Sequence, residues 1–182
     1  MADLITSDLD DDMKNSWRTD PAIFNALNAE FNFKLDAAAS SENALCDRYL
    51  TIEDDSLSVD WSSFGLVPNP TYSVWVNPPY SRGMIEKFMA KAIEQKGKGL
   101  TTVMLVPATL DAQWLPVNDI SEIRIVTGGR LSFYHPITGK KVNGNTKGSM
   151  LVIFRPSSMP CSIRLIDRNE ILGTTKKIKA AA

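Results

Sequence analysis

Apolar residues recur every three or four positions in two stretches of the chain, which predicts amphipathic helices over residues 21–30 and 83–96. The first helix has Thr19 or Asp20 as its candidate N-cap. Pro21 stands in its first turn, where a backbone N–H would have no hydrogen-bond partner within the helix. The stretch "SENALCDRYL" predicts no more than a helical turn.

Alternating or continuous apolar runs predict the strands. "FNFKLD" alternates up to Asp36, "YSVWV" leads to Asn77, and a short strand-like run precedes the acidic pair Asp54 and Asp55. The run "LTTVMLV" is continuous, as in a strand buried on both faces. Further on, the chain predicts two strands in "EIRIVTGGRLSFYHP", a flexible basic loop in "ITGKKVNGNTKG", a strand in "SMLVIFRP" and a final strand or helix in "CSIRLIDRNEILG".

This order of elements predicts an α/β fold. Strand and helix alternate early and adjacent strands close the chain, which is typical of a mostly parallel, doubly wound sheet with an antiparallel C-terminal edge. Ligands of such sheets bind beyond the carboxyl ends of the strands. Since Asp36, the pair Asp54 and Asp55, and Asn77 each follow a predicted strand, we expect them to form one site.

The chain of 182 residues is long enough for one good core. We expect a single domain over residues 17–170, between a flexible acidic segment 1–16 and a basic tail 171–182. No run of about 18 apolar residues occurs and the acidic N-terminus does not resemble a leader, so we expect a soluble, cytoplasmic protein. Two cysteines and one histidine, without any cluster of Cys and His, predict neither a disulfide framework nor a metal site.

Charge divides the chain into two unequal halves. Residues 1–81 carry four Lys and Arg against fourteen Asp and Glu, a net charge of −10, whereas residues 82–182 carry sixteen against seven, a net charge of +9. The division fits two solvated faces of opposite sign, and it equally fits a basic half that binds a polyanion. Composition alone leaves both open.

The stretch "VWVNPPYSRG" carries the most specific chemistry. Two prolines after an apolar strand cannot continue its ladder and make a rigid turn. Asn77 and Pro78 offer a side-chain and a main-chain oxygen as acceptors, which suits an amino group with two hydrogens. Pro79 stiffens the turn and Tyr80 offers a flat face to a planar base or amide. The target predicted from these residues is an exocyclic or amide NH₂.

Asn77, Pro78, Pro79 and Tyr80 resemble the catalytic motif of amino methyltransferases that use S-adenosylmethionine. The wider pattern "W.T.P..F..L...F.F.LDAAAS..NA.C.RY......DSLS.DW" resembles the phage-type DNA N6-adenine methyltransferase family in particular, over residues 17–155. The resemblance implies a Rossmann-like methyltransferase fold, S-adenosylmethionine as methyl donor and adenine in double-stranded DNA as acceptor. If the chain is phage-encoded, it acts in the host cytoplasm.

The resemblance also assigns roles to single residues. Asn77 and Pro78 accept hydrogen bonds from the adenine amino group and Tyr80 stacks on a flipped-out base. The implied cofactor contacts are Trp17, Thr19, Pro21, Asp36, Ala37, Ala38, Asn77 and either Asp54 or Asp55. The family's glycine-rich turn after the first strand is absent from "LDAAASSEN", and only 41 positions lead from Asp36 to Asn77, so one βα unit of the usual fold is missing.

The basic half supplies the candidate DNA contacts. Arg82 follows the motif closely enough to reach a phosphate, and solvation at the surface fits its position equally well. Arg130, Lys140, Lys141 and Lys147 form a basic strand and loop. A chain of this length has little room for a separate recognition domain, and we expect it to be monomeric or weakly dimeric.

Other functions remain open on the sequence. N4-cytosine and protein-glutamine methyltransferases share this motif or close variants of it, and an inactive relative would keep the fold alone. The pair Pro160-Cys161 suggests a cytosine C5 nucleophile, but it follows the predicted strands without an active-site context and is interpreted as structural or incidental. Cys46 is interpreted as a small buried residue, and His135 as structural or phosphate-facing rather than catalytic.

Overall fold

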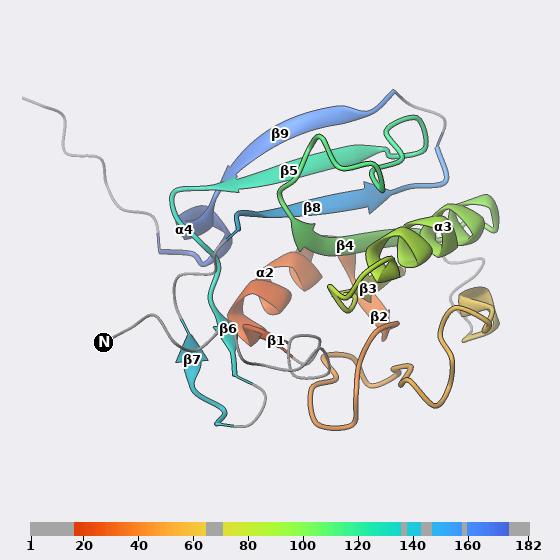
Figure 1. The fold of residues 1–182 in the computed structure, drawn as a ribbon, viewed down its shortest axis with the longest axis horizontal. Coiled ribbons are helices and arrows are strands. Elements are labelled where there is room, and N and C mark those ends of the chain that lie inside the picture. The colour runs from red at the N-terminus through yellow and green to blue at the C-terminus, as the bar shows by residue number, and fades with distance from the viewer. Residues whose placement is uncertain (1–16, 65–70, 136–137, 143–146, 158–159, 175–182) are drawn as a thin grey trace, which may run out of the picture.

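A computed structural model describes residues 17–64, 71–135, 138–142, 147–157 and 160–174 (Figure 1). The predicted acidic N-terminal segment 1–16 and most of the predicted basic tail, residues 175–182, lie outside the described residues. The mixed α/β class predicted from the sequence is confirmed, because helices pack on a central sheet.

The central sheet has six strands in the order β2-β3-β4-β8-β5-β9. The pairs β2–β3, β3–β4 and β5–β9 are parallel, and β8 runs antiparallel to both of its neighbours. In sheet order, the strands are β2 (Phe33–Asp36), β3 (Ser73–Val76), β4 (Thr101–Pro107), β8 (Ser149–Phe154), β5 (Glu122–Thr127) and β9 (Ser162–Asp167).

The predicted antiparallel edge is wrong: the antiparallel strand lies inside the sheet and the edge strand β9 is parallel to β5. Burial explains the order. All six residues of β8 are buried on both faces, whereas five of the six residues of β9 are exposed. A strand that is apolar on both faces gains most from a central position, which leaves the edge to the more exposed strand.

Helices cover both faces of the sheet. Helix α3 (Met84–Gly97) packs on the face that carries Val74 and Val76, and α2 (Pro21–Phe31) packs on the face that carries Trp75. Asp20 is the N-cap of α2, where its Oδ1 accepts a hydrogen bond from the Ala22 amide at 3.0 Å. The predicted helices over 21–30 and 83–96 are confirmed. Within the described ranges, no helix is long and apolar enough to cross a membrane.

A small antiparallel sheet joins the start of the described chain to its basic half. It consists of β1 (Arg18–Thr19), β6 (Phe133–Tyr134) and β7 (Lys141–Val142), in the order β1-β6-β7. Part of the stretch predicted to be a flexible basic loop is therefore strand β7. The sheet places β1 beside a hairpin that follows it by more than a hundred positions.

The segment between β2 and β3 differs most from the prediction. The predicted helical turn is present, because the Asn43 and Ala44 amides donate to Ser40 O at 3.2 and 3.0 Å. Residues 46–48 form a bend, and Tyr49 makes only an isolated bridge to Asp36. Residues 52–58 form turns, so Asp54 and Asp55 do not follow a strand as predicted. The short 3₁₀ helix η1 (Trp61–Phe64) closes the segment with the fully buried Trp61. The last predicted element, a strand or a helix, is both: β9 is followed by α4 (Arg168–Ile171).

Candidate active site

The Asn-Pro-Pro-Tyr motif stands at the carboxyl end of β3, as predicted. All four residues of β3 are buried, so the strand fixes the position from which the motif starts. Pro78 is buried, whereas Asn77 and Pro79 are half-buried. Since neither proline can donate to the ladder, pairing stops at Val76 and the side chains beyond it are turned toward the end of the sheet.

Asn77 and Tyr80 contact each other inside the motif. The Tyr80 hydroxyl lies 3.1 Å from Asn77 Oδ1 and 3.2 Å from the main-chain oxygen of Leu105 in β4. The Asn77 amide nitrogen lies 3.5 Å from the main-chain oxygen of Trp17. Because the amide nitrogen faces a carbonyl, the Oδ1 atom of Asn77 is left as an acceptor.

Tyr80 is anchored at its hydroxyl end, while part of the residue is exposed. Its relative exposure is 37%, although burial of the hydroxyl raises the pKa of Tyr80 well above its usual value. A neutral hydroxyl held by two oxygens leaves the ring as the accessible part. Such a ring can stack on a planar group.

Asp36 is buried and turned toward main-chain amides. Its Oδ1 accepts a hydrogen bond from the Ala38 amide at 3.4 Å and its Oδ2 accepts one from the Leu45 amide at 3.2 Å. Desolvation raises the pKa of Asp36 to about 6, and the two amides oppose that shift. The carboxyl group thus holds together both ends of the segment 37–45, which also joins the sheet through the hydrogen bond from Ala37 N to Trp75 O at 3.0 Å.

A cavity of about 790 Å³ opens beside the motif. The lining residues that a bound ligand would contact include Pro79 of the motif, Ala37 and Ala38 after β2, Asp55, and Arg18 of β1. Its size is that of a site for a small molecule or cofactor. Small alanine side chains allow a ligand to approach the main chain closely where other enzymes use glycine.

The structure distinguishes the two predicted acidic residues. Asp54 Oδ2 accepts hydrogen bonds from the Thr51 amide and hydroxyl at 2.8 and 2.9 Å, which lower the pKa of Asp54. Asp55 lines the cavity and has a left-handed backbone with φ 48°, and its Oδ2 accepts a bond from the Ser58 hydroxyl at 2.5 Å. Asp55 is therefore the member of the pair that a ligand in the cavity can reach.

The predicted residues of the 17–21 segment have different positions. Trp17 contacts Asn77 through its main-chain oxygen, whereas Thr19 is buried against Phe133 and Pro21 is exposed at the start of α2. Arg18, which lies inside this predicted segment but was not named as a contact, lines the cavity. Its only sequence signal was its place between Trp17 and Thr19.

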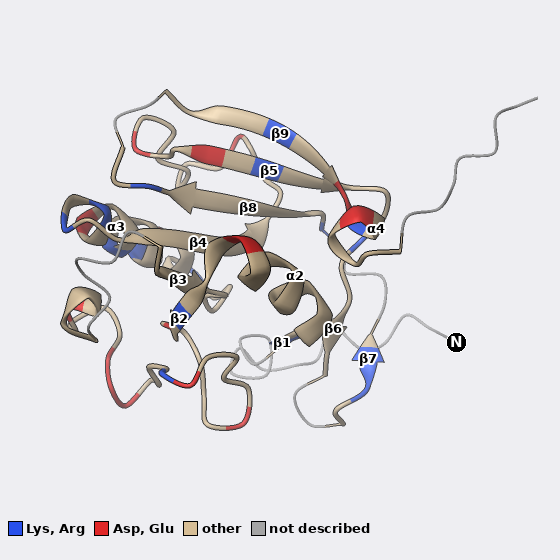
Figure 2. Cartoon of the chain, turned by 180° about the vertical axis from the view of Figure 1, so that it is seen from behind, with Lys and Arg blue, Asp and Glu red and all other residues tan. Residues whose placement is uncertain are grey.

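The predicted DNA contacts are exposed and lie on several elements. Arg82 precedes α3, Arg130 follows β5, and Lys140 and Lys141 belong to the hairpin of β6 and β7. Figure 2 shows Lys and Arg in blue on β7 and on several other elements. Arg130 lies against Gly148, next to Lys147. Lys141 Nζ lies 2.5 Å from Asp20 Oδ2, and this hydrogen bond raises the pKa of Lys141. Lys141 is thus an ion-pair partner of the α2 N-cap.

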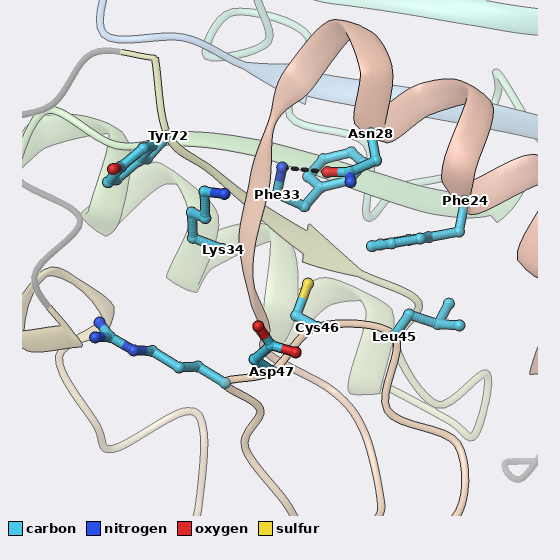
Figure 3. Close-up of a pocket in the computed structure, with 9 residues that line it drawn as sticks. Phe24, Asn28, Phe33, Lys34, Leu45, Cys46, Asp47 and Tyr72 are labelled. Atoms are coloured by element: carbon cyan, nitrogen blue, oxygen red, sulfur yellow. Dashed lines mark hydrogen bonds between the residues drawn. The ribbon is translucent and has the colours of Figure 1, made fainter.

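A second cavity of about 610 Å³ lies between α2 and the segment 45–48 (Figure 3). There the Asn28 side chain accepts a hydrogen bond from Phe33 N at 2.6 Å, and Lys34 Nζ lies 5.4 Å from the centre of the Tyr72 ring. Burial raises the pKa of the Cys46 thiol to about 12, so it remains protonated at neutral pH. None of the predicted catalytic or cofactor residues lines this cavity.

Comparison with known proteins adds independent evidence. Residues 6–178 match the model of the family described as DNA N-6-adenine-methyltransferase (Dam). Proteins named DNA N-6-adenine-methyltransferase from Escherichia phage T1 and Haemophilus phage HP1 are 33% and 31% identical over 162 and 150 residues, each covering 80% of this chain. The match covers 64% of the phage T1 protein and 81% of the phage HP1 protein. A shorter match, 37% identical over 67 residues, joins 36% of this chain to 71% of the putative methyltransferase YfdM of Escherichia coli K12.

Proposed function

The chain belongs to the DNA N-6-adenine-methyltransferase (Dam) family, and on that premise we propose that it transfers a methyl group from S-adenosylmethionine to the N6 amino group of adenine in double-stranded DNA. The resemblance found in the sequence is confirmed by this membership, and the enzyme class, adenine-specific DNA methyltransferase, follows from it. The observation that carries the proposal is the position of Asn77 and Tyr80 at the end of β3, beside a cavity of cofactor size.

The residues around the cavity fit S-adenosylmethionine. Asp55 offers a carboxylate for ribose hydroxyls, Arg18 a guanidinium for the methionine carboxylate, and Ala37 and Ala38 allow close approach to the main chain. Pro79 belongs both to the cavity wall and to the motif, so a ligand in the cavity lies next to Asn77 and Tyr80. When bound, S-adenosylmethionine supplies an electrophilic methyl group on a sulfonium.

The chain's own residues then align and polarise the acceptor. Asn77 Oδ1 and the main-chain oxygen of Pro78 accept hydrogen bonds from the two hydrogens of the adenine amino group, which favours attack by its nitrogen lone pair on the methyl carbon. With the methyl donor bound, the amine nitrogen would gain the methyl group as the methyl–sulfur bond breaks, and it would lose a proton to solvent. No histidine, thiol or metal is needed for this direct transfer.

Tyr80 has the second role in the proposal. An amino group within a base pair cannot reach Asn77, so the base leaves the duplex and stacks on the accessible Tyr80 ring. The exposed Arg82, Arg130, Lys140 and Lys147 supply cations for the DNA backbone. The fold inferred with this function is the Rossmann-like methyltransferase fold, supported by three adjacent parallel strands with helices on both faces.

The experiment uses S-adenosylmethionine with a labelled methyl group and unmethylated double-stranded DNA, followed by digestion to nucleosides. We expect the label in N6-methyladenine, and we expect Asn77→Ala to abolish it while calorimetry shows cofactor affinity within a few fold of the native value. Label in N4-methylcytosine would keep the mechanism and change the base, whereas label in added protein would replace DNA as the substrate. Full activity of Asn77→Ala would remove that residue from the reaction.

A further inference from the structure

Strand β9 has an open hydrogen-bonding edge. β9 is the last strand of the sheet, and no described element lies along its outer side (Figure 1). The Ser162 amide donates to Ser121 O at 3.1 Å, so Ser162 directs its main-chain groups toward the β5 side. Because the direction alternates along a strand, Ile163 and Leu165 direct their N–H and C=O groups outward.

The same edge exposes two large apolar side chains. Ile163 and Leu165 are 62% and 71% exposed, and the alternation of side chains along the strand places both on one face of β9. The side chain of Ile166, on the other face, packs against the core beneath α4. An edge strand that combines unpaired main-chain groups with exposed apolar side chains is a template for another strand.

We propose that this edge pairs with β9 of a second copy of the chain, antiparallel about a two-fold axis at Ile163, to form one sheet that runs through both copies. In this register Ile163 faces Ile163, and Cys161 faces Leu165 of the other copy. Ile163 directs its main-chain groups outward in both copies, so the two Ile163 residues exchange two hydrogen bonds. The apolar side chains lie together on one face of the joined sheet.

The pairing of side chains disfavours two other registers. An axis at Arg164 would place two guanidinium groups directly opposite, and an axis at Leu165 would place Ile163 opposite Asp167. With the axis at Ile163, Arg164 stands opposite Ser162. The Arg164 guanidinium leans over its own sheet, where Nη1 lies 3.5 Å from Glu122 Oε1, so it does not block the edge.

The pairing leaves both candidate active sites accessible. Strands β4, β8 and β5 lie between β9 and β3, at whose end the motif stands. The dimer therefore does not depend on the proposed methyl transfer, and either conclusion can fail without the other.

Sedimentation velocity over a concentration series tests the proposal. We expect the native chain to approach twice its monomer mass as concentration rises, and Ile163→Lys to raise the dimer dissociation constant at least tenfold. Val117→Lys, which changes another exposed apolar residue (53% exposed), should leave it unchanged. A second test combines Ile163→Cys with Cys46→Ser and Cys161→Ser. If the register holds, mild oxidation links two copies through position 163, whereas Val117→Cys in the same background does not link them.

Three results would overturn the proposal. The first is a native chain that stays monomeric at every concentration of the series. The second is an Ile163→Lys variant that dimerises as strongly as the native chain and has the same melting temperature. The third is a dimer in which oxidation of the Ile163→Cys variant forms no disulfide between the two copies.

Discussion

The hydroxyl of Tyr80 lies 3.1 Å from Asn77 Oδ1, the atom proposed to accept a hydrogen bond from the target amino group. It also lies 3.2 Å from Leu105 O. A tyrosine hydroxyl has one hydrogen, so it can fully satisfy only one of these two acceptors. When it donates to Leu105, Asn77 Oδ1 is available to the amino group of the base. The tyrosine therefore anchors its ring without permanently occupying the acceptor.

Two variants of Tyr80 separate its ring from its hydroxyl. Tyr80→Phe keeps the stacking surface and frees Asn77 Oδ1, so we expect kcat within about tenfold of the native value, the hydroxyl bond contributing about 1 kcal/mol. Tyr80→Ala removes the stacking surface, and we expect the extruded base to bind about 1 to 3 kcal/mol more weakly. Single-turnover methylation and the fluorescence of 2-aminopurine at the target position measure the two effects. Equal loss in both variants would show that the ring is not the contact.

Asp36 should make the free energy of unfolding fall as pH rises, which is opposite to the usual effect of a carboxylate in an ion pair. Burial raises its pKa from 3.8 to about 6, so the folded chain holds this proton more tightly than the unfolded chain. The resulting contribution favours folding most below about pH 4 and is lost as pH rises through about 6, a change of about 3 kcal/mol.

Asp36→Asn cannot titrate, and it keeps one oxygen acceptor for the two amides. Relative to the native chain, its free energy of unfolding should therefore rise between pH 4 and pH 7. Urea unfolding of both proteins across this range measures the difference, which cancels the titration of all other groups. Parallel curves would mean that Asp36 is solvated or ionised throughout.

Asp54 and Asp55 give a matched pair for the cofactor cavity. Asp55 lines the cavity and Asp54 caps a turn through Thr51. Asparagine tolerates the left-handed backbone of residue 55, so Asp55→Asn changes charge without strain. We expect Asp55→Asn to weaken S-adenosylmethionine binding about tenfold or more, the range of a hydrogen bond to a charged group. Asp54→Asn should bind as the native chain does in calorimetry. The reverse order would assign the cofactor contact to Asp54.

Local patterns predicted the elements whose causes are local. The helix over residues 21–31 follows from Asp20, Pro21 and the spacing of its apolar residues, and the motif follows a strand because two prolines end the ladder. The place of β8 was not predictable in this way. Its sequence indicates a buried strand but does not encode which strands become its neighbours.

The site was predicted as a set of residues, but the use of each residue depends on tertiary contacts. Asp36 was predicted as a cofactor contact, and its carboxylate accepts hydrogen bonds from amides at both ends of its loop, because the bend from Ala38 to Leu45 brings those amides to it. The buried Arg124 likewise has a partner that only the tertiary fold brings to it. It binds both oxygens of Glu30 at 2.6 Å across 94 positions of the chain, a pairing that neither local stretch indicates.

Two neighbouring lysines on the β6–β7 hairpin, Lys140 and Lys141, should affect DNA binding in different ways, one through a phosphate contact and the other through an ion pair within the chain. Lys140 is exposed, so Lys140→Ala should remove one phosphate contact and reduce the slope of log affinity against log salt by about 0.9. Lys141 holds Asp20, whose other oxygen caps α2, and thus ties β7 to the segment that reaches Asn77 through Trp17. Lys141→Ala should therefore lower the melting temperature and the methylation rate while leaving the salt slope unchanged, because the lost charge already had a partner.

Fluorescence anisotropy with labelled DNA at several salt concentrations, together with thermal melting, distinguishes the two variants. If Lys141→Ala reduced the slope and left melting unaltered, the ion pair with Asp20 would give way to DNA in the complex, and Lys141 would be a phosphate contact as the sequence predicted.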